Sequence, residues 1–296
     1  MMKIKRFFQR AYHFLIRIIK GLKIIPQNIK NFGIRFAAIS YIDGIFPPEK
    51  SPYYISAAES YIDSFTEKLV AEYAKEKYIP EEKMVTAFDK VPVWCCWWQG
   101  IENMPEIVAM CHRRLADVIP ETAEIRLITE SNYRDYVQLP VYILDMLNSG
   151  KMSITALSDI LRVSLLAEYG GFWIDSTVFV SGEFPEAFIS NNFYSQKMYD
   201  PIKWSHEACK GRWCGFMMSG SKNNIIFRYI RDAYLIWWKE HDTLIDYVIL
   251  DYFLLSAYKR IPIIKQMIDQ VPDNNTDVFE MYKVLHKKYS DGLMKK

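Results

Sequence analysis

The chain has 296 residues, of which half are apolar and 15% aromatic, and its formal net charge is +2. This length and apolar content are sufficient for a sizeable core, in one large domain or two small ones, and exclude a disordered chain. The five cysteines lack the paired close spacing of a zinc site, so the sequence predicts a reducing compartment and no structural metal; they are Cys95, Cys96, Cys111, Cys209 and Cys214.

The N-terminal region is strongly basic, because nine Lys or Arg residues precede the first acidic residue, Asp43. Because nine of the 37 bases lie in the N-terminal region, the rest of the chain has 28 bases and 35 acids and therefore a net charge of −7. The first residues therefore form a basic arm that is electrostatically separate from the rest of the protein.

The arm has the pattern of an amphipathic helix. Its apolar side chains recur at helical spacing: Phe7, Phe8, Ala11, Leu15, Ile18, Ile19, Leu22 and Ile25. The adjoining face carries Arg6, Arg10, His13, Arg17 and Lys20. Basic residues interrupt every apolar run before the ~20 residues that a membrane span needs, and no small-residue cleavage site follows.

We therefore expect residues 1–36 to lie on an anionic membrane surface, which places the protein in the cytoplasm, peripheral on the inner face of the cell membrane. Nucleic acid is disfavoured as a partner, because arms that bind nucleic acid seldom need an Ile, Leu and Phe stripe. An ordinary helix packed on the domain is the remaining alternative.

The prolines at 47, 48 and 52 divide the chain into the membrane-associating arm, residues 1–50, and a domain over 51–296. Hydrophobic periodicity predicts helices over 57–78, 102–115, 139–147, 154–169, 224–240 and 244–258. Strands are predicted over 91–98, 124–129, 172–174, 178–180, 193–196 and 215–219. Strands that alternate with helices predict an α/β fold with a mostly parallel sheet covered by helices on both faces.

One segment brings several polar residues to the end of a predicted strand. Asp159 and Arg162 are three residues apart on one helix face, where they can offer an acceptor and a fork of donors to a sugar. A two-glycine turn, Gly170-Gly171, leads into a strand that places Trp173 and Asp175 on the same side. Such a pair can hold a ribose or a phosphate-bound cation, and a simple salt bridge between Asp159 and Arg162 is the structural alternative.

A further candidate acid lies in an apolar, aromatic helix that contains Asp246 and Asp251. A buried carboxylate costs several kcal/mol unless it is paired, so Asp251 is a candidate acceptor-side or catalytic acid. A buried hydrogen bond that links two helices is the alternative.

The runs LSDILR at 157–162 and YGGFWID at 169–175 resemble the sugar-binding region with the DXD motif of family-32-type glycosyltransferases. They are closer still to the bacterial capsular polysaccharide synthesis branch, in which the strand reads W-I-D-x-T. Two more segments match in order, WWQG at 97–100 with Pro105-Glu106, and TESN at 129–132. The resemblance covers residues 91–180, extends more weakly over 211–258 and does not include the arm.

The resemblance implies a GT-A-like fold, whose mixed sheet has a Rossmann-like nucleotide-binding half. It also implies a glycosyltransferase, specifically a hexosyltransferase, that moves a sugar from a UDP- or GDP-sugar to a lipid-linked or saccharide acceptor in capsular polysaccharide biosynthesis. Retention of the anomeric configuration is expected. A sugar-phosphate transferase and a non-catalytic sugar-binding scaffold are the alternatives.

The resemblance also implies roles for individual residues. Asp159 and Arg162 would contact the donor sugar, and Asp175 would hold ribose or the metal. The remaining donor-binding residues are Trp98, which would stack on the base, Gln99, Asn132 near the nucleoside, Ser158, Trp173 and Ser176.

A divalent cation, Mn²⁺ or Mg²⁺, is the implied cofactor, with Asp175 and Thr177 as its ligands. Thr177 stands where the motif has a second acid, so weaker metal binding is expected. Basic residues near the C-terminus could supply the positive charge that offsets a diphosphate, or they could form a solvated tail. They are Lys283, His286, Lys287 and Lys288.

Overall fold

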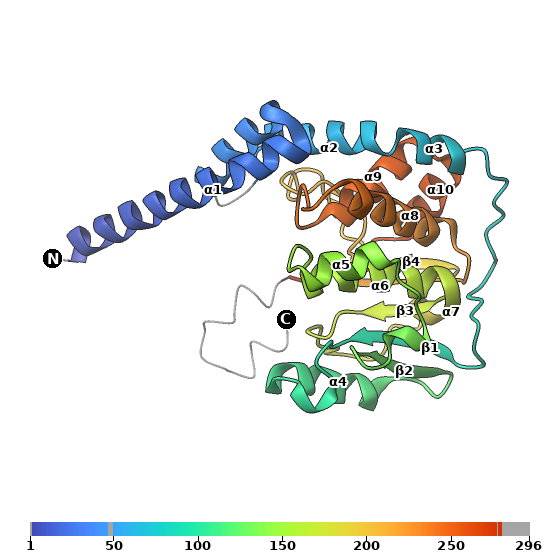
Figure 1. Ribbon diagram of the computed structural model, residues 1–296. Helices are drawn as coiled ribbons and strands as arrows, with labels where there is room; N and C mark the ends of the chain where they lie inside the picture. The colour runs from blue at the N-terminus through green and yellow to red at the C-terminus, as the bar shows by residue number, and fades with distance from the viewer. Residues whose placement is uncertain (1, 47–49, 277, 280–296) are drawn as a thin grey trace.

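The computed structural model describes residues 2–46, 50–276 and 278–279. This part of the chain has a five-stranded sheet with the order β2-β1-β3-β5-β4 at its centre (Figure 1). The strands are β1 (Val91–Cys96), β2 (Ala123–Ile128), β3 (Gly171–Ile174), β4 (Phe193–Ser195) and β5 (Met217–Gly220). Strand β1 pairs in parallel with β2 and β3, whereas β5 is antiparallel to both β3 and β4, so β5 alone among these strands is reversed. The predicted α/β fold with a mostly parallel sheet is confirmed.

The sheet separates two hydrophobic cores, because successive side chains along a strand point to opposite faces. Trp94, Trp173 and Met218 join the larger core. It contains residues of α2 (Pro52–Phe65), α3 (Glu67–Tyr73), α5 (Val141–Asn148), α6 (Ile154–Tyr169), α8 (Ile225–Glu240), α9 (Ile249–Arg260) and α10 (Pro262–Gln270). Phe172 and Met217 point to the other face, which is covered by α4 (Glu106–Val118) and α7 (Ala187–Ser190). Helices therefore cover both faces, as predicted.

Four predicted elements need correction. The helix predicted over 102–115 begins only at Glu106, as α4, because residues 101–103 form a separate 3-10 helix. The predicted helix over 57–78 is divided between α2 and α3, because Thr66 turns its hydroxyl back to the carbonyl of Ile62 and to Ser256. No strand forms over 178–180 in the described chain, because the amide of Val178 donates to the carbonyl of Asp175 and closes a turn directly after β3. Helix α9 begins five residues later than predicted, since the Asp246 carboxylate accepts the Val248 amide and holds a turn there.

Two short 3-10 helices and two α-helices, α7 and α10, were not predicted. The 3-10 helices Ile101–Asn103 and Tyr133–Asp135 follow β1 and β2, respectively. Helix α10 begins at Pro262, a position at which the fixed φ of proline suits the first turn. In the sequence pattern this proline indicates only a break.

The arm forms a helical hairpin within α1 (Met2–Ile45), and the N-terminal part of this helix projects from the body of the domain (Figure 1). The reversal occurs at Gly33, whose φ of 82° is readily adopted only by glycine. The two limbs touch through Asn28 and Ser40, whose side chains lie 3.3 Å apart, and through the Tyr41 ring, which covers Gly21. No described helix is both long enough and apolar enough to cross a membrane.

The hairpin leaves part of the predicted apolar stripe exposed and buries apolar residues that follow the stripe in the chain. Leu15, Ile19 and Leu22 are each more than half exposed, whereas Phe32 and Phe36 are buried in the domain core. Residues around Phe32 therefore pack on the domain, which is the alternative that was given for the arm. Only the outer part of the arm, the limb that carries Leu15, Ile19 and Leu22, remains available to a membrane. The predicted boundary at Pro47-Pro48, and the side chains of Arg6, Phe7, Phe8, Arg10 and Ala11, lie outside the described part.

Candidate active site

The carboxyl ends of the three parallel strands meet at one edge of the sheet. The Ser176 hydroxyl, just after β3, donates to the carbonyl of Cys96 at the end of β1, at 2.7 Å. The amide of Glu130, just after β2, donates to the carbonyl of Trp98 at 2.9 Å. In open α/β sheets this edge is where ligands bind.

The glycine turn between α6 and β3 positions the site. Gly170 and Gly171 both have positive φ, 70° and 105°. A Cβ on Gly171 would lie 2.3 Å from the carbonyl oxygen of Pro92, so only glycine lets the chain approach β1 this closely. The turn thus brings the end of β3 back beside α6.

Arg162 joins the two carboxylates that the sequence placed near each other. Its Nη1 lies 3.0 Å from Asp159 Oδ1 on the same helix, and its Nη2 lies 2.8 Å from Asp175 Oδ1 after β3. The Arg162 side chain is only 7% exposed, whereas that of Asp175 is 36% exposed. The salt bridge given as the alternative for Asp159 and Arg162 is therefore present, and Asp175 extends it toward solvent.

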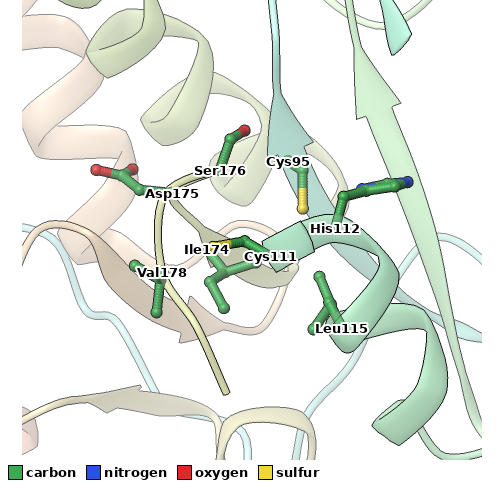
Figure 2. A pocket seen from close by; sticks show the side chains of 8 residues that line it. All are labelled: Cys95, Cys111, His112, Leu115, Ile174, Asp175, Ser176 and Val178. Carbon is green, nitrogen blue, oxygen red and sulfur yellow. The ribbon is translucent and has the colours of Figure 1, made fainter. Parts of the chain in front are cut away.

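Asp175 has one oxygen engaged and one available. Its Oδ1 accepts from Arg162 and also from the Trp173 indole Nε1 at 2.7 Å, while its Oδ2 has no partner among the described residues. Figure 2 shows Asp175 and Ser176 pointing away from Cys111 and Leu115 of α4. The cavity on the α4 side has a volume of about 10 Å³, room for about one water, so a ligand would approach Asp175 from the open side.

Burial and neighbouring charges shift the pKa values of the ionisable groups in this cluster. Burial raises the pKa of Asp159 to about 6, although Arg162 acts in the opposite direction. Burial tends to lower the pKa of Arg162, but Asp175 and Asp159 outweigh it and raise that pKa. Arg162 is therefore a fixed cation between two acids.

Two residues given donor-binding roles use their side chains locally. The Asn132 amide accepts from the Thr129 amide at 2.8 Å and donates to the Leu127 carbonyl at 2.9 Å, so it holds the turn after β2. Ser158 donates to the carbonyl of Thr155 within its own helix. Among the described residues, neither side chain hydrogen-bonds to Asp159, Arg162 or Asp175, which together form the Arg162 cluster.

The predicted base-stacking tryptophan is largely covered. Trp98 is 9% exposed and packs on the Tyr133 ring, with 5.2 Å between ring centroids. Its neighbour Trp97 is half-buried, and Gln99 and Thr177 are exposed at the same edge of the sheet. A nucleoside at this edge would meet Trp97 more readily than Trp98.

Asp251 is buried at the start of α9. It accepts from the Trp213 indole at 2.8 Å, and burial raises its pKa to about 7. Asp246, its companion in the sequence, is also buried and pairs with Lys50 at 2.9 Å. This bond is not the helix-to-helix link proposed as the alternative, because Trp213 lies in the irregular segment before β5, so the bond ties α9 to that segment. Among the described residues Asp251 has no hydrogen bond to Asp159 or Asp175, although its charge helps to raise the pKa of Tyr234, the hydroxyl partner of Asp159.

We expect the free energy of unfolding to fall as the pH rises from about 4 to about 7. The pKa values of Asp159 and Asp251 are raised from 3.8 to about 6 and about 7, so over this window the folded protein binds protons that the unfolded chain has released. For Asp251 the loss is on the order of 4 kcal/mol. In the variant Asp251→Asn this side chain no longer titrates. Its free energy of unfolding, measured in urea, should therefore fall less with pH, and the fall should end near pH 6, the pKa of Asp159. The exposed Asp117→Asn is the control, and matching profiles for all three proteins would contradict the expectation.

Two contributors to the cluster were not predicted from the sequence. The Tyr234 hydroxyl on α8 lies 3.4 Å from Asp159 Oδ2, and the backbone at Gly215 approaches Arg162 so closely that a Cβ there would lie 3.2 Å from Nη1. Tyr234 occurs in an aromatic helix pattern that indicates core packing alone. In the sequence, only Gly215 before β5 could have indicated that the backbone approaches another group closely.

The described residues offer limited metal coordination. They contain no group of three or more His, Cys, Asp or Glu side chains that could hold a metal ion. Asp175 Oδ2 has no partner in the described part of the chain, however, and magnesium-type sites often use one carboxylate together with substrate phosphates and water. These residues therefore fit a cation that is held mainly by a bound diphosphate. The predicted basic cluster from Lys283 to Lys288 lies outside the described residues.

Comparison with known proteins supplies a family. The family model described as "Capsular polysaccharide synthesis protein" matches residues 50–296. No curated protein matches the chain. Among solved structures, one described as "PaToxG Glycosyltransferase" is similar with a TM-score of 0.44 and 15% sequence identity, covering 82% of this chain and 94% of that chain.

Proposed function

This chain belongs to the capsular polysaccharide synthesis protein family, and on that basis we propose that it is a glycosyltransferase of the GT-A kind. The donor is a UDP- or GDP-sugar, and the acceptor is a saccharide or a lipid-linked saccharide of a capsule or surface polysaccharide. Residues 50–296, which the family model matches, include the whole sheet and the Arg162 cluster.

One observation carries the proposal: Asp175, anchored by Arg162 and Trp173, presents an oxygen without a partner among the described residues at the carboxyl edge of the parallel strands. An anchored carboxylate can bind sugar hydroxyls or a cation without first losing side-chain freedom. Its anchor is itself buried, so the geometry is set before a ligand binds.

The transfer needs a new bond between an acceptor hydroxyl oxygen and the donor's anomeric carbon, as the bond from that carbon to the diphosphate breaks. We propose that the departing diphosphate takes the hydroxyl proton and that the anomeric configuration is retained. A divalent cation bound at Asp175 would offset the charge of the leaving group. The protein itself would contribute mainly positioning and electrostatic stabilisation.

The test is a panel of UDP- and GDP-sugars, each with and without Mn²⁺, incubated with candidate acceptors and analysed by mass. A product heavier by one glycosyl residue supports the proposal. Transfer of a sugar together with its phosphate would instead identify a sugar-phosphate transferase. No product, with retained nucleotide-sugar binding, would favour a binding scaffold.

The outer part of the arm supports a second proposal, that the protein lies on the cytoplasmic face of an anionic membrane. Arg17, Lys20 and Lys23 are exposed and have no ion-pair partner among the described residues. They alternate with the exposed apolar side chains of Leu15 and Ile19 on the same limb. This combination of charge and apolar surface is typical of interfacial helices.

We expect the triple substitution Arg17→Gln, Lys20→Gln and Lys23→Gln to weaken binding to phosphatidylserine-containing vesicles about 100-fold. Each basic residue near an anionic surface contributes about 1 kcal/mol, so three contribute about 3 kcal/mol. Vesicle co-sedimentation of the full chain measures the effect. The control is a triple substitution of exposed lysines in and just after α3, Lys68, Lys75 and Lys77, which should bind as the wild type does. Equal binding to neutral vesicles would contradict the membrane proposal.

A further inference from the structure

A second cavity lies between α2, α9 and the segment that precedes β5. Its volume is about 320 Å³, within the range of small-molecule sites. Charged side chains on its wall are Glu59 from α2, Lys210 and Arg212 from the segment before β5, and Lys259 from α9. Asp159, Arg162 and Asp175 do not line it, so it is separate from the Arg162 cluster.

The cavity carries an excess of positive charge. Lys259 is neutralised, because it pairs with Glu59 and lies 3.2 Å from Asp63. Lys210 and Arg212 have no carboxylate within ion-pair distance among the described residues. Arg162 differs from them, since two carboxylates flank it. Two uncompensated cations on the wall of a cavity favour an anionic ligand.

Arg212 is held in place before any ligand binds. Its guanidinium lies 4.6 Å from the Tyr199 ring centroid and 5.3 Å from that of Tyr258, and its Nη1 donates to the Cys209 carbonyl. A fixed guanidinium fork loses little entropy when it binds a phosphate or carboxylate.

Lys210 has an unusual backbone. Its φ of 51° lies in the left-handed region, which lysine seldom adopts, and such strained residues cluster at functional sites. The strain is a second, independent feature of the same wall.

The cavity lies within reach of the Arg162 cluster along two elements. Gly215, whose backbone approaches Arg162, is three residues beyond Arg212 in the chain. On α9, Leu250 faces Gly215 and Tyr258 lines the cavity, and these eight residues span about 12 Å at the helical rise of 1.5 Å per residue. An extended saccharide could bridge this separation.

We propose that this cavity binds the acceptor through an anionic group, a phosphate or a carboxylate carried by a sugar. This inference rests on the proposed glycosyl transfer and adds the chemical class of the acceptor. A phosphate would belong to the reducing end of a lipid-linked acceptor, and a carboxylate to a uronic acid within the chain.

Isothermal titration calorimetry on the full chain tests the proposal with glucose 1-phosphate, glucuronate and glucose as probes. We expect at least one charged sugar to bind and glucose to bind at least about tenfold more weakly, because charged hydrogen bonds are the stronger ones. Lys210→Asn, which tolerates the left-handed backbone, and Arg212→Gln should each weaken the charged probe about tenfold or more. The probe that binds identifies the phosphate or the carboxylate.

The matched control is Lys203→Gln, which removes an exposed cation from the same segment without touching the cavity wall and should change nothing. Arg212→Lys keeps the charge, and its intermediate affinity would support a charge-based site even if Lys210→Asn fails to fold. Equal binding of all three sugars, no binding of either charged sugar, or unchanged binding by both cavity variants would overturn the proposal.

UDP binding separates this proposal from the proposed function. We expect Lys210→Asn to bind UDP as the wild type does and Asp175→Asn to bind the charged sugar as the wild type does. Loss of UDP binding in both cavity variants would mean that the cavity holds the donor, which overturns the acceptor assignment. Absence of UDP binding in the wild type, with charged-sugar binding intact, would instead count against the donor site alone.

Discussion

Replacing Arg162 with methionine is expected to destabilise the protein by about 3–5 kcal/mol and to abolish measurable glycosyl transfer. Breaking a buried ion pair by removing one partner costs this much, because the other charge is left uncompensated. Arg162 is 7% exposed and is the shared partner of Asp159 and Asp175, so its loss affects two carboxylates at once. Urea unfolding measures the stability, and the nucleotide-sugar panel measures the transfer.

The pH dependence separates lost charge from lost packing. Arg162 holds down the pKa of Asp159, so the methionine variant should have an even higher pKa at that residue. Protonation relieves the uncompensated charge, and the loss of stability should therefore be smaller at pH 5 than at pH 8. A second substitution, Asp159→Asn, should recover part of the loss. Arg113→Met, which breaks an exposed pair with Glu106, is the control and should cost less than about 1 kcal/mol. An equal loss at both pH values would assign the effect to packing alone.

Strong local signals made most of the fold predictable. The helix over 154–169 was predicted with both ends correct, because Ser153 caps its first turn and the Gly170-Gly171 pair ends it. Elements whose ends depend on side-chain contacts were placed less well. The turn held by Asp246 delays α9, and nothing in the local pattern reveals that its carboxylate bonds the Val248 amide.

The hairpin of the arm could not be predicted for a related reason. A single glycine within a helical pattern is usually tolerated, so Gly33 did not indicate a reversal. The reversal depends on contacts such as that of Tyr41 with Gly21, which are twenty residues apart.

The candidate site was predictable where it is local in sequence. Asp159, Arg162 and Asp175 lie within one helix, turn and strand, so their meeting followed from periodicity and the glycine turn. Contributions from distant segments were not visible in the sequence. Tyr234 reaches Asp159 from α8, and the second cavity joins α2 to α9 across roughly two hundred residues of chain, from Glu59 to Lys259.

Asp175→Asn is expected to lower kcat/KM for glycosyl transfer by about 100-fold or more while leaving the fold intact, since removing one group that stabilises charge in the transition state costs about that much. Asparagine keeps an acceptor for Arg162 and for the Trp173 indole but loses the negative charge of the free oxygen. The side chain is 36% exposed, so solvent screens the change and the unfolding midpoint should move little. Steady-state kinetics with the nucleotide sugar identified by the panel measures the loss.

The companion substitution Thr177→Asp tests why Asp175 matters. If the carboxylate acts by holding a cation, a second acid beside it should lower the Mn²⁺ concentration needed for half-maximal activity, because carboxylates bind hard cations more strongly than hydroxyls. If it acts by binding ribose or sugar hydroxyls, Thr177→Asp should leave the metal dependence unchanged while Asp175→Asn still loses activity. Asp117→Asn on α4 is the surface control and should match the wild type. Full activity in Asp175→Asn would move the active site away from the Arg162 cluster.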